Sequence, residues 1–454
     1  MDRPPRSTPP RPLAAVLLVN FVDTLGFSVV LPFLVFVITR LGGNAFVYGL
    51  ASAVYPACQL ASAPVMGRWS DQFGRKRLLL LCEAGTVAGW VVLAAALALP
   101  ATPVAKVDWA LTGAFTVTWP LVLVFAARAA DGMTAGSASI ASAYVADVTT
   151  PEERSRAFGY MGVSSNLGFV VGPAVAGALG STALGDRLPV YVTLGISLAA
   201  AALIAFYLPE SHARSAAPHP PPDSACEVLG KRHGARAGPG GLRQTLAIRH
   251  VPRMLALYFA TFLGFNFYYS SFPVHAVQNL GFSIGASGAY FATLSVLMVA
   301  VQAFVLPSAA KRWTDAQLIT SGAALLCANF LLLLSWSPVA VWASVALFAL
   351  GNGLMWPSAV ALLSKLAGDG RQGVVQGLAS SVGSLASIGG LIAGGLVFEK
   401  LGAWTFALSA ALILVAGACA PRTGLALGPA GGARTSPGAL HVDSSAPPKG
   451  CSPS

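Results

Sequence analysis

Twelve long apolar segments occupy most of this 454-residue chain and restrict how it can fold. In lipid, every backbone N–H and C=O group must be paired inside its own segment, so about 20 consecutive apolar residues predict a spanning helix. Only 10% of the residues are charged, against about 25% in an average soluble chain. We therefore predict an all-α membrane protein with twelve transmembrane helices, at 13–38, 46–67, 78–99, 119–146, 157–180, 188–208, 254–278, 287–310, 316–336, 339–363, 374–397 and 402–420. Residues 100–118 could belong in part to the fourth helix.

A polar segment divides these helices into two halves of six, 13–208 and 253–420. The segment between them, 209–252, is rich in Pro, Gly and basic residues, which predicts a flexible linker. Residues 1–12 form a short head without a cleavage pattern, so no removable signal peptide is expected. The Pro, Gly and Ser content of the tail, 421–454, predicts disorder.

Short matches recur between the two halves in the same order. "RWSD" at 68–71 corresponds to "RWTD" at 312–315, and "ADGM" at 130–133 corresponds to "GNGL" at 351–354. Each match is short, but their shared order indicates a duplicated six-helix unit. Transporters built from such repeats place their binding site at the repeat interface.

The basic residues are distributed very unevenly between alternate loops. Of the 28 Lys and Arg residues, 23 fall on one side of the predicted membrane, 4 fall on the other, and Arg128 lies inside a helix. This bias follows the positive-inside rule and predicts that both termini and the linker are cytoplasmic. The net charge of +11 is thus explained by topology, and nucleic acid is not an expected partner.

The densest charged cluster is "GRWSDQFGRKR" (67–77), in a very short connection between two predicted helices. Gly67 and Gly74 would permit a tight backbone, and Asp71 could accept a hydrogen bond from Arg75. Topology alone would explain the basic residues. It would not explain Gly67, Asp71 and Gly74 together.

This loop resembles the signature of the major facilitator superfamily, and the chain from about 13 to 420 is similar to its drug:proton antiporters, the tetracycline-exporter-like group. The resemblance is carried by "GRWSDQFGRKR" together with "VDTLGFSVVLP" (22–32), "RAADG" (128–132), "ADVTTPEERSRAFG" (146–159) and "GFVVGPAVAG" (168–177). It implies two six-helix halves that alternate between inward-open and outward-open states.

The resemblance also implies a gate and a difference in substrate. Asp71, Arg75 and Asp147 would form a charge cluster near residues 373–377 that locks the cytoplasmic side while the outside is open. Tetracycline exporters of this group carry an Asp in the middle of the third helix, where this chain has Gly89. A substrate other than tetracycline is therefore expected.

The fifth predicted helix is rich in glycine around one proline. Gly168, Gly172 and Gly177 bracket Pro173 and are predicted to lie largely on one face. Small residues of this kind let helices pack closely in lipid. In transport they would act as a bending or sealing contact.

Four ionisable residues within the predicted helices of the first half are candidates for proton coupling: Asp23, Glu83, Arg128 and Asp131. A carboxylate such as Asp23 costs about 2.5–3.5 kcal/mol or more at a bilayer centre, and such residues usually line transport pathways. A structural ion pair between Arg128 and Asp131 is the alternative, and Glu83 could instead reach the membrane surface. His275, near the end of the seventh helix, is expected at the interface. The second half has no acidic residue in the middle of a helix, so proton traffic should use the first half.

The second half instead offers aromatic residues in "FLGFNFYYSSFP" (262–273). These would either line a cavity for a planar amphipathic ligand or form an aromatic belt at the outer interface. The substrate-cavity candidates are Phe265, Asn266, Tyr268, Tyr269, Asn352, Met355 and Trp356, with Phe272 beside them.

These observations predict a secondary transporter that exports small amphipathic molecules in exchange for protons. The alternatives are a metabolite symporter or uniporter on the same fold, or a non-transporting membrane receptor or scaffold. No enzymatic activity, metal or cofactor is expected, because the six cysteines lack zinc-site spacing and no catalytic motif is present. The expected partners are the substrate, protons and the bilayer, with the protein acting as a monomer.

Overall fold

The computed structural model describes residues 11–210, 246–248, 250–335, 337–367 and 372–420. The predicted tail, nearly all of the head and most of the linker lie outside these residues. The first half contains α1 (Arg11–Arg40), α2 (Ala45–Phe73), α3 (Arg75–Ala98), α4 (Trp119–Met133), α5 (Ser137–Val148), α6 (Pro151–Gly180) and α7 (Arg187–Tyr207). The second half contains α10 (Val251–Gln278), α11 (Ile284–Ala300), a π-helical turn (Val301–Val305), α12 (Leu306–Ala309), α13 (Asp315–Leu332), α14 (Pro338–Ala367), α15 (Gln372–Leu401) and α16 (Thr405–Ala418).

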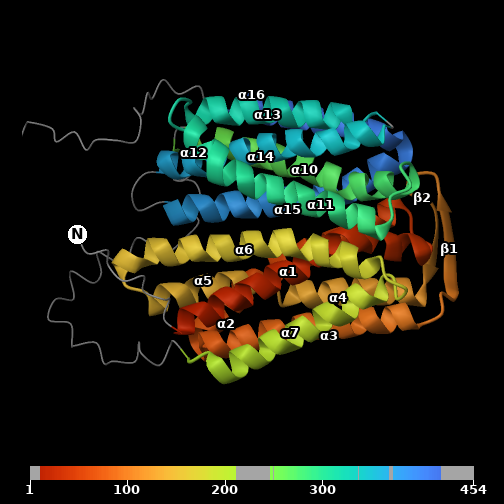
Figure 1. Cartoon of the computed structure of the whole chain (residues 1–454), viewed down its shortest axis with the longest axis horizontal. Helices are drawn as coiled ribbons and strands as arrows, with labels where there is room; N and C mark the ends of the chain where they lie inside the picture. The colour runs from red at the N-terminus through yellow and green to blue at the C-terminus, as the bar shows by residue number, and fades with distance from the viewer. Residues whose placement is uncertain (1–10, 211–245, 249, 336, 368–371, 421–454) are drawn as a thin grey trace, which may run out of the picture.

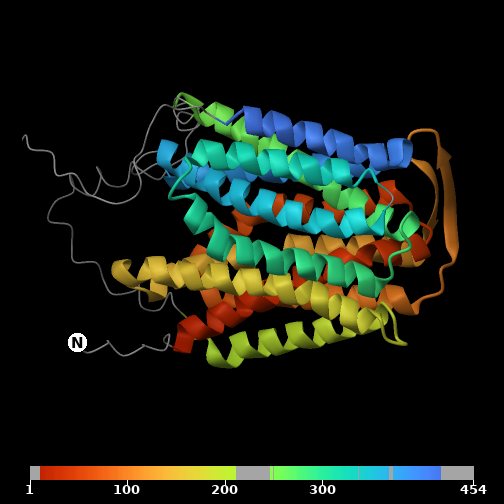
Figure 2. The same cartoon turned by 45° about the horizontal axis from the view of Figure 1, so that its top comes forward.

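The helices run roughly along one long axis, and the two halves lie side by side (Figure 1). A β-hairpin covers one end of this bundle in both views (Figure 2). We call this the hairpin end. The opposite end, where α1 begins and α7 ends, is the linker end.

Each of the twelve predicted ranges contains helix. Among the described residues, eight helical stretches are long and apolar enough to cross a membrane. The chain is therefore an integral multi-pass membrane protein, and the count of twelve spanning helices stays a prediction. The fourth predicted helix is interrupted between α4 and α5, where Thr134 and Gly136 lower the helix propensity.

The extension of the fourth helix into residues 100–118 was a wrong prediction. These residues form the antiparallel strands β1 (Pro103–Trp109) and β2 (Gly113–Thr118), in which Lys106 pairs with Thr116. Val, Thr, Phe and Trp favour strands, and Gly113 adopts a φ of 72° at the turn, a conformation that favours glycine.

Packing within the two halves follows the same plan. In the first half α1 packs along α6, and in the second half α10 packs along α15. The halves meet through two equivalent contacts, α2 with α15 and α6 with α11. This arrangement agrees with the internal duplication that the short sequence matches predict.

Close backbone approaches between the halves lie toward the hairpin end. Gly49 of α2 lies against Leu391 and Gly395 of α15, and Gly177 of α6 lies against Gly288 of α11. Toward the linker end, a Cβ atom at Gly67 or at Gly377 would have no described neighbour within 4 Å. The halves are thus tightly packed at the hairpin end. At the linker end, these two glycines have no close described neighbour from the other half.

The predicted topology can be tested by labelling with an impermeant thiol reagent. Single cysteines in 209–252 and near both termini should react from the cytoplasm, because the basic residues gather on that side. Cysteines beside Lys106 and Arg187 should react from the opposite side. External labelling of the linker would contradict the 23-to-4 charge bias.

Candidate transport site and gate

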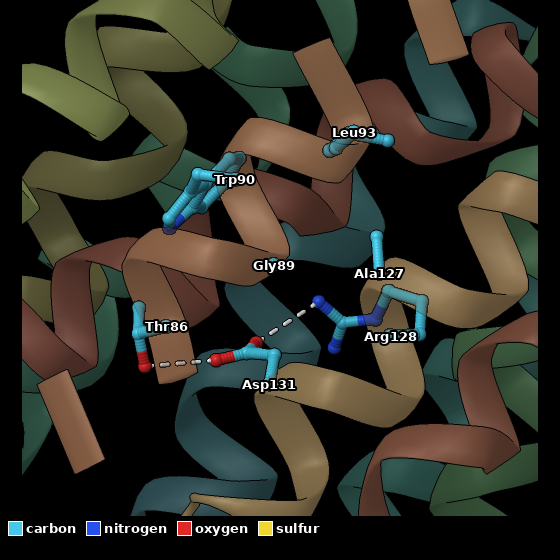
Figure 3. Close-up of a pocket in the computed structure, with 7 residues that line it drawn as sticks. All are labelled: Thr86, Gly89, Trp90, Leu93, Ala127, Arg128 and Asp131. Carbon is cyan, nitrogen blue, oxygen red and sulfur yellow. Dashed lines mark hydrogen bonds and ion pairs between the residues drawn. The ribbon is translucent and has the colours of Figure 1, made fainter. Parts of the chain in front are cut away.

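An ion pair between Arg128 and Asp131 lies inside the first half (Figure 3). Arg128 Nη1 lies 3.4 Å from Asp131 Oδ2, and Thr86 Oγ1 donates to Asp131 Oδ1 at 3.0 Å. The guanidinium also stacks over the Tyr55 ring at 4.9 Å. Only 6% of Arg128 is exposed, so the pair is buried and is fixed from α2 and α3 as well as from α4.

Asp23 of α1 and Glu83 of α3 form a second contact, in which their carboxyl groups meet each other. Ser137 interacts with Asp23, and Ser197 interacts with Glu83. Two of the carboxyl oxygens, Asp23 Oδ2 and Glu83 Oε1, are buried without a hydrogen-bond donor among the described residues. Because ionised carboxylates can only accept hydrogen bonds, a proton shared between them would provide the missing donor.

Glu83 is 1% exposed, so the alternative that it reaches the membrane surface is wrong. Asp131 interacts electrostatically with both Asp23 and Glu83, which places all four ionisable candidates in one cluster. We call Asp23, Glu83, Arg128 and Asp131 the charge cluster. The periodicity of each helix could not show this clustering, because it depends on how α1, α3 and α4 pack.

Gly89 faces the charge cluster from α3. A Cβ atom there would lie 3.1 Å from Ala127 O and 3.3 Å from the Asp131 Cβ. The small cavity beside Gly89, about 10 Å³, has room for about one water (Figure 3). Asp131 of α4 thus lies next to Gly89 of α3.

Asp71 and Arg75 of the 67–77 loop, which are predicted gate residues, meet at the linker end. Arg75 Nη1 donates to Asp71 Oδ1 at 2.6 Å, and Arg75 Nε donates to Asp147 Oδ2 at 3.2 Å. Gly74 separates α2 from α3 at a φ of 95°, which lets the chain turn without a linking loop.

Glu210, which was not predicted as a site residue, also lies in this cluster. Its carboxylate accepts from the backbone N–H groups of Arg75 at 2.8 Å and Lys76 at 3.3 Å, at the start of α3. A carboxylate stabilises a helix N-terminus by pairing with its free N–H groups. The only signal in the sequence is an acidic residue directly after the sixth helix.

The second half carries a related ion pair that was not predicted. Lys365, near the end of α14, lies 2.5 Å from Asp315 at the start of α13. Asp315 ends "RWTD", the counterpart of "RWSD", which ends at Asp71. Asp71 and Asp315 thus occupy matching positions in the two halves. Each pairs with a basic residue of another helix, Asp71 with Arg75 of α3 and Asp315 with Lys365 of α14.

The expected approach of the gate to residues 373–377 is not seen at Gly377. The side-chain partners of Arg75 among the described residues are Ser70, Asp71 and Asp147, all in the first half. A Cβ at Gly377 would meet nothing described within 4 Å. In this structure the two halves are in contact at the hairpin end, where Gly49 of α2 lies against Gly395 of α15.

Removing the Asp71 carboxylate should impair transport without unfolding the protein. Asp71→Asn keeps the size of a side chain that is 68% exposed, and exposed ion pairs contribute only about 0–1 kcal/mol. We expect near-normal membrane levels and strongly reduced transport in a proteoliposome flux assay. Gln72→Ala, at the exposed neighbouring position, is the control. Transport by Asp71→Asn at the unmodified rate would exclude the gating role.

The glycines of α6 do not share one face, contrary to the prediction. Gly168 and Gly172 lie against α1, at Leu25 and Ser28, whereas Gly177 lies against α11. Glycine thus allows α6 to pack closely both within its half and across the interface. Pro173 is buried between these two contacts.

Several aromatic cavity candidates are instead core residues of the second half. Phe265, Tyr268 and Phe272 are buried, and the Tyr268 ring contacts Phe348 at 5.2 Å. Met355 is also fully buried, so Phe265, Tyr268 and Met355 do not line an accessible cavity. The sequence alone could not show which aromatic residues of the helix pack in the core and which line a cavity.

The remaining cavity candidates are partly exposed. Asn266 donates to Ser387 Oγ of α15 at 3.0 Å, and Asn352 Nδ2 lies 3.6 Å from the Met298 sulfur. Tyr269 and Trp356 are also half-buried. These four residues stay candidates for substrate contact.

His275 lies in the last turn of α10, near the end of its helix as predicted, but its side chain is enclosed by the protein. The residue is fully buried, its ring meets Phe406 edge-on at 5.3 Å, and its Nδ1 lies 2.8 Å from Asn279 Nδ2. It therefore belongs to the packed hairpin end of the second half.

Two pseudo-equivalent helical halves, with ionisable residues buried inside one of them, define the class of multi-pass membrane transporters. Within that class, the chain belongs to the Major Facilitator Superfamily, whose family model matches residues 16–391. The predicted fold class and family are confirmed, and the chain is a transporter and not an enzyme.

The similar proteins include tetracycline and multidrug resistance proteins. The chain is 27% identical over 402 residues to the class C tetracycline resistance protein of Escherichia coli, which covers 87% of this chain and 92% of that protein. It is 26% identical over 388 residues to multidrug resistance protein 1 of Bacillus subtilis (strain 168), with coverages of 85% and 89%.

Solved structures show the same fold at lower identity. A D-xylose-proton symporter matches with a TM-score of 0.70 and 14% identity, over 89% of this chain and 95% of that one. A human organic anion transporter matches with a TM-score of 0.60 and 21% identity, over 91% and 100%.

Proposed function

We propose that this protein exports small amphipathic molecules across a membrane in exchange for protons. It would do so by alternating access, with both termini in the cytoplasm and one chain as the working unit. The relatives that are tetracycline and multidrug resistance proteins support export of drug-like molecules. The fold alone does not distinguish export from uptake, since a proton symporter shares it.

The observation that carries the proposal is the excess of carboxyl groups in the charge cluster. Asp23, Glu83 and Asp131 are balanced by Arg128 alone, so full ionisation would leave a net charge of −2 inside the first half. Uncompensated charge is expensive there, and protons on two carboxyl groups would neutralise it. The contacting carboxyl groups of Asp23 and Glu83 are the best place for an exchangeable proton.

Such a cluster can couple two fluxes. Burial favours the neutral form of a carboxyl group, whereas water and a nearby guanidinium favour the ionised form. When the site opens to one side, water enters and a proton can leave. When it closes, the cluster must take up a proton or a cationic group of the substrate. Exclusive occupancy by one or the other produces exchange.

The same charge excess suggests the class of substrate. A cationic amphipathic molecule, such as a lipophilic amine, could replace the protons that neutralise the charge cluster. Its apolar part would lie against half-buried residues of the second half, of which Tyr269, Trp356, Asn266 and Asn352 are the candidates. Gly89 in place of an Asp favours a substrate other than tetracycline.

A proteoliposome assay with an imposed pH gradient tests this function. The panel would contain fluorescent lipophilic amines, sugars and organic anions. Gradient-driven accumulation of an amine, against the direction of proton flow, is the expected result. Gradient-independent flux would favour a uniporter, flux in the direction of the protons would favour a symporter, and no flux of any compound would favour a receptor or scaffold.

A further inference from the structure

Three segments meet at one carboxylate at the hairpin end. Glu399, near the end of α15, accepts a hydrogen bond from the backbone N–H of Ala45 at 3.3 Å. Ala45 is the first residue of α2, in the other half. The Glu399 side chain also lies against Gly113, at the turn between β1 and β2. Glu399 is therefore a charged contact from the second half onto two segments of the first.

The hairpin itself is fixed to the first half by several hydrogen bonds. Asn44 Nδ2 donates to Thr112 O at 2.7 Å, and Asn44 Oδ1 accepts from Val47 N as the N-cap of α2. Thr116 N donates to Gly42 O at 2.9 Å, and Thr118 Oγ1 donates to Leu41 O at 3.0 Å. The hairpin and the start of α2 thus form one surface, and Glu399 touches both.

The electrostatics of this contact favour closure. The first N–H groups of a helix have no partner inside the helix and carry partial positive charge. Asn44 satisfies Val47 N, and Glu399 satisfies Ala45 N with a full negative charge. One turn further along, α2 and α15 pack closely where Gly49 meets Gly395. The carboxylate can reach Ala45 only while these helices are together.

From these contacts we infer that Glu399 is a gating residue that holds the hairpin end closed by binding the N-terminus of α2. When the hairpin end opens, α15 must leave α2, and Glu399 must exchange Ala45 N–H for water. Loss of this charge would therefore shift the population toward the state that is open at the hairpin end. The inference depends on alternating access but not on proton coupling.

The test measures opening directly by thiol labelling. The six native cysteines are replaced by alanine, and Val274→Cys is added on α10, where Val274 is 1% exposed in a core cluster formed mainly by the first half. An impermeant maleimide is applied from the hairpin side to protein in membranes. Glu399→Gln should raise the labelling rate about fivefold, the size expected for loss of a carboxylate at a helix N-terminus.

Two further variants show whether the effect belongs to the charge at this position. Glu399→Asp keeps a carboxylate near Ala45 and should label close to the parent rate. Lys400→Gln changes an exposed charge on the adjacent residue and should have no effect. The inference is overturned if Glu399→Gln labels no faster than the parent, or if Lys400→Gln accelerates labelling equally. Because labelling needs no gradient or substrate, failure here is distinguishable from failure of proton coupling.

Discussion

Asp23→Asn is expected to abolish uphill, gradient-driven transport while leaving the protein in the membrane at near-normal levels. Asparagine has nearly the same size but cannot release a proton, so the pair with Glu83 would lose its exchange function. Downhill exchange of substrate should persist, because it needs no net proton movement. The measurement is substrate flux in proteoliposomes with and without a pH gradient.

Asp108→Asn is the matched control, because Asp108 is an exposed carboxylate on β1, outside the helical bundle. It should transport like the unmodified protein. Accumulation of substrate by Asp23→Asn at the unmodified rate would show that Asp23 is not the coupling carboxylate. Glu83→Gln and Asp131→Asn would then be tested in the same assay.

Arg128→Gln should have the second large effect, on both stability and transport. Arg128 is the one basic residue of the four that form the charge cluster. It is buried against Asp131 and Tyr55. Breaking a buried ion pair by removing one partner costs about 3–5 kcal/mol, because the other charge stays buried without compensation. We expect lower membrane levels and no gradient-driven transport.

Two comparisons separate the structural effect of Arg128→Gln from the transport effect. Arg128→Lys keeps the charge and should recover membrane levels better than transport, because lysine lacks the planar group that stacks on Tyr55 and pairs with Asp131. The double variant Arg128→Gln/Asp131→Asn should recover stability, because it removes both charges. Normal stability and normal transport in Arg128→Gln alone would show that this pair has no role.

The features that could be predicted from the sequence are those that a single helix or loop specifies by itself. Apolar segment length and the alternation of basic loops located the helices, because backbone pairing in lipid leaves few alternatives. The loop at 67–77 predicted the Asp71–Arg75 contact, because these residues are four apart across a tight turn. The short matches between halves predicted the duplicated packing of α1–α6 and α10–α15.

The rest depends on how helices pack against each other, which one sequence does not specify. Asp23 and Glu83 are 60 positions apart, and only the packing of α1 and α3 brings their carboxyl groups together. Tyr268 and Met355 are residue types that often line ligand cavities, but here both are buried in the core of their own half. Glu210 and Glu399 act on backbone N–H groups at the starts of other helices, and such contacts leave no local pattern.

The coupling of substrate to protons can be measured most directly by imposing a substrate gradient and following the proton movement that it drives. Purified protein in proteoliposomes is given a substrate gradient but no pH gradient, and the internal pH is followed with a trapped dye. We predict that substrate leaving the vesicles drives protons inward, and that Asp23→Asn eliminates the pH change while exchange of labelled substrate continues. Substrate movement without any proton movement in the unmodified protein, or with protons in the same direction, would contradict proton exchange at the charge cluster.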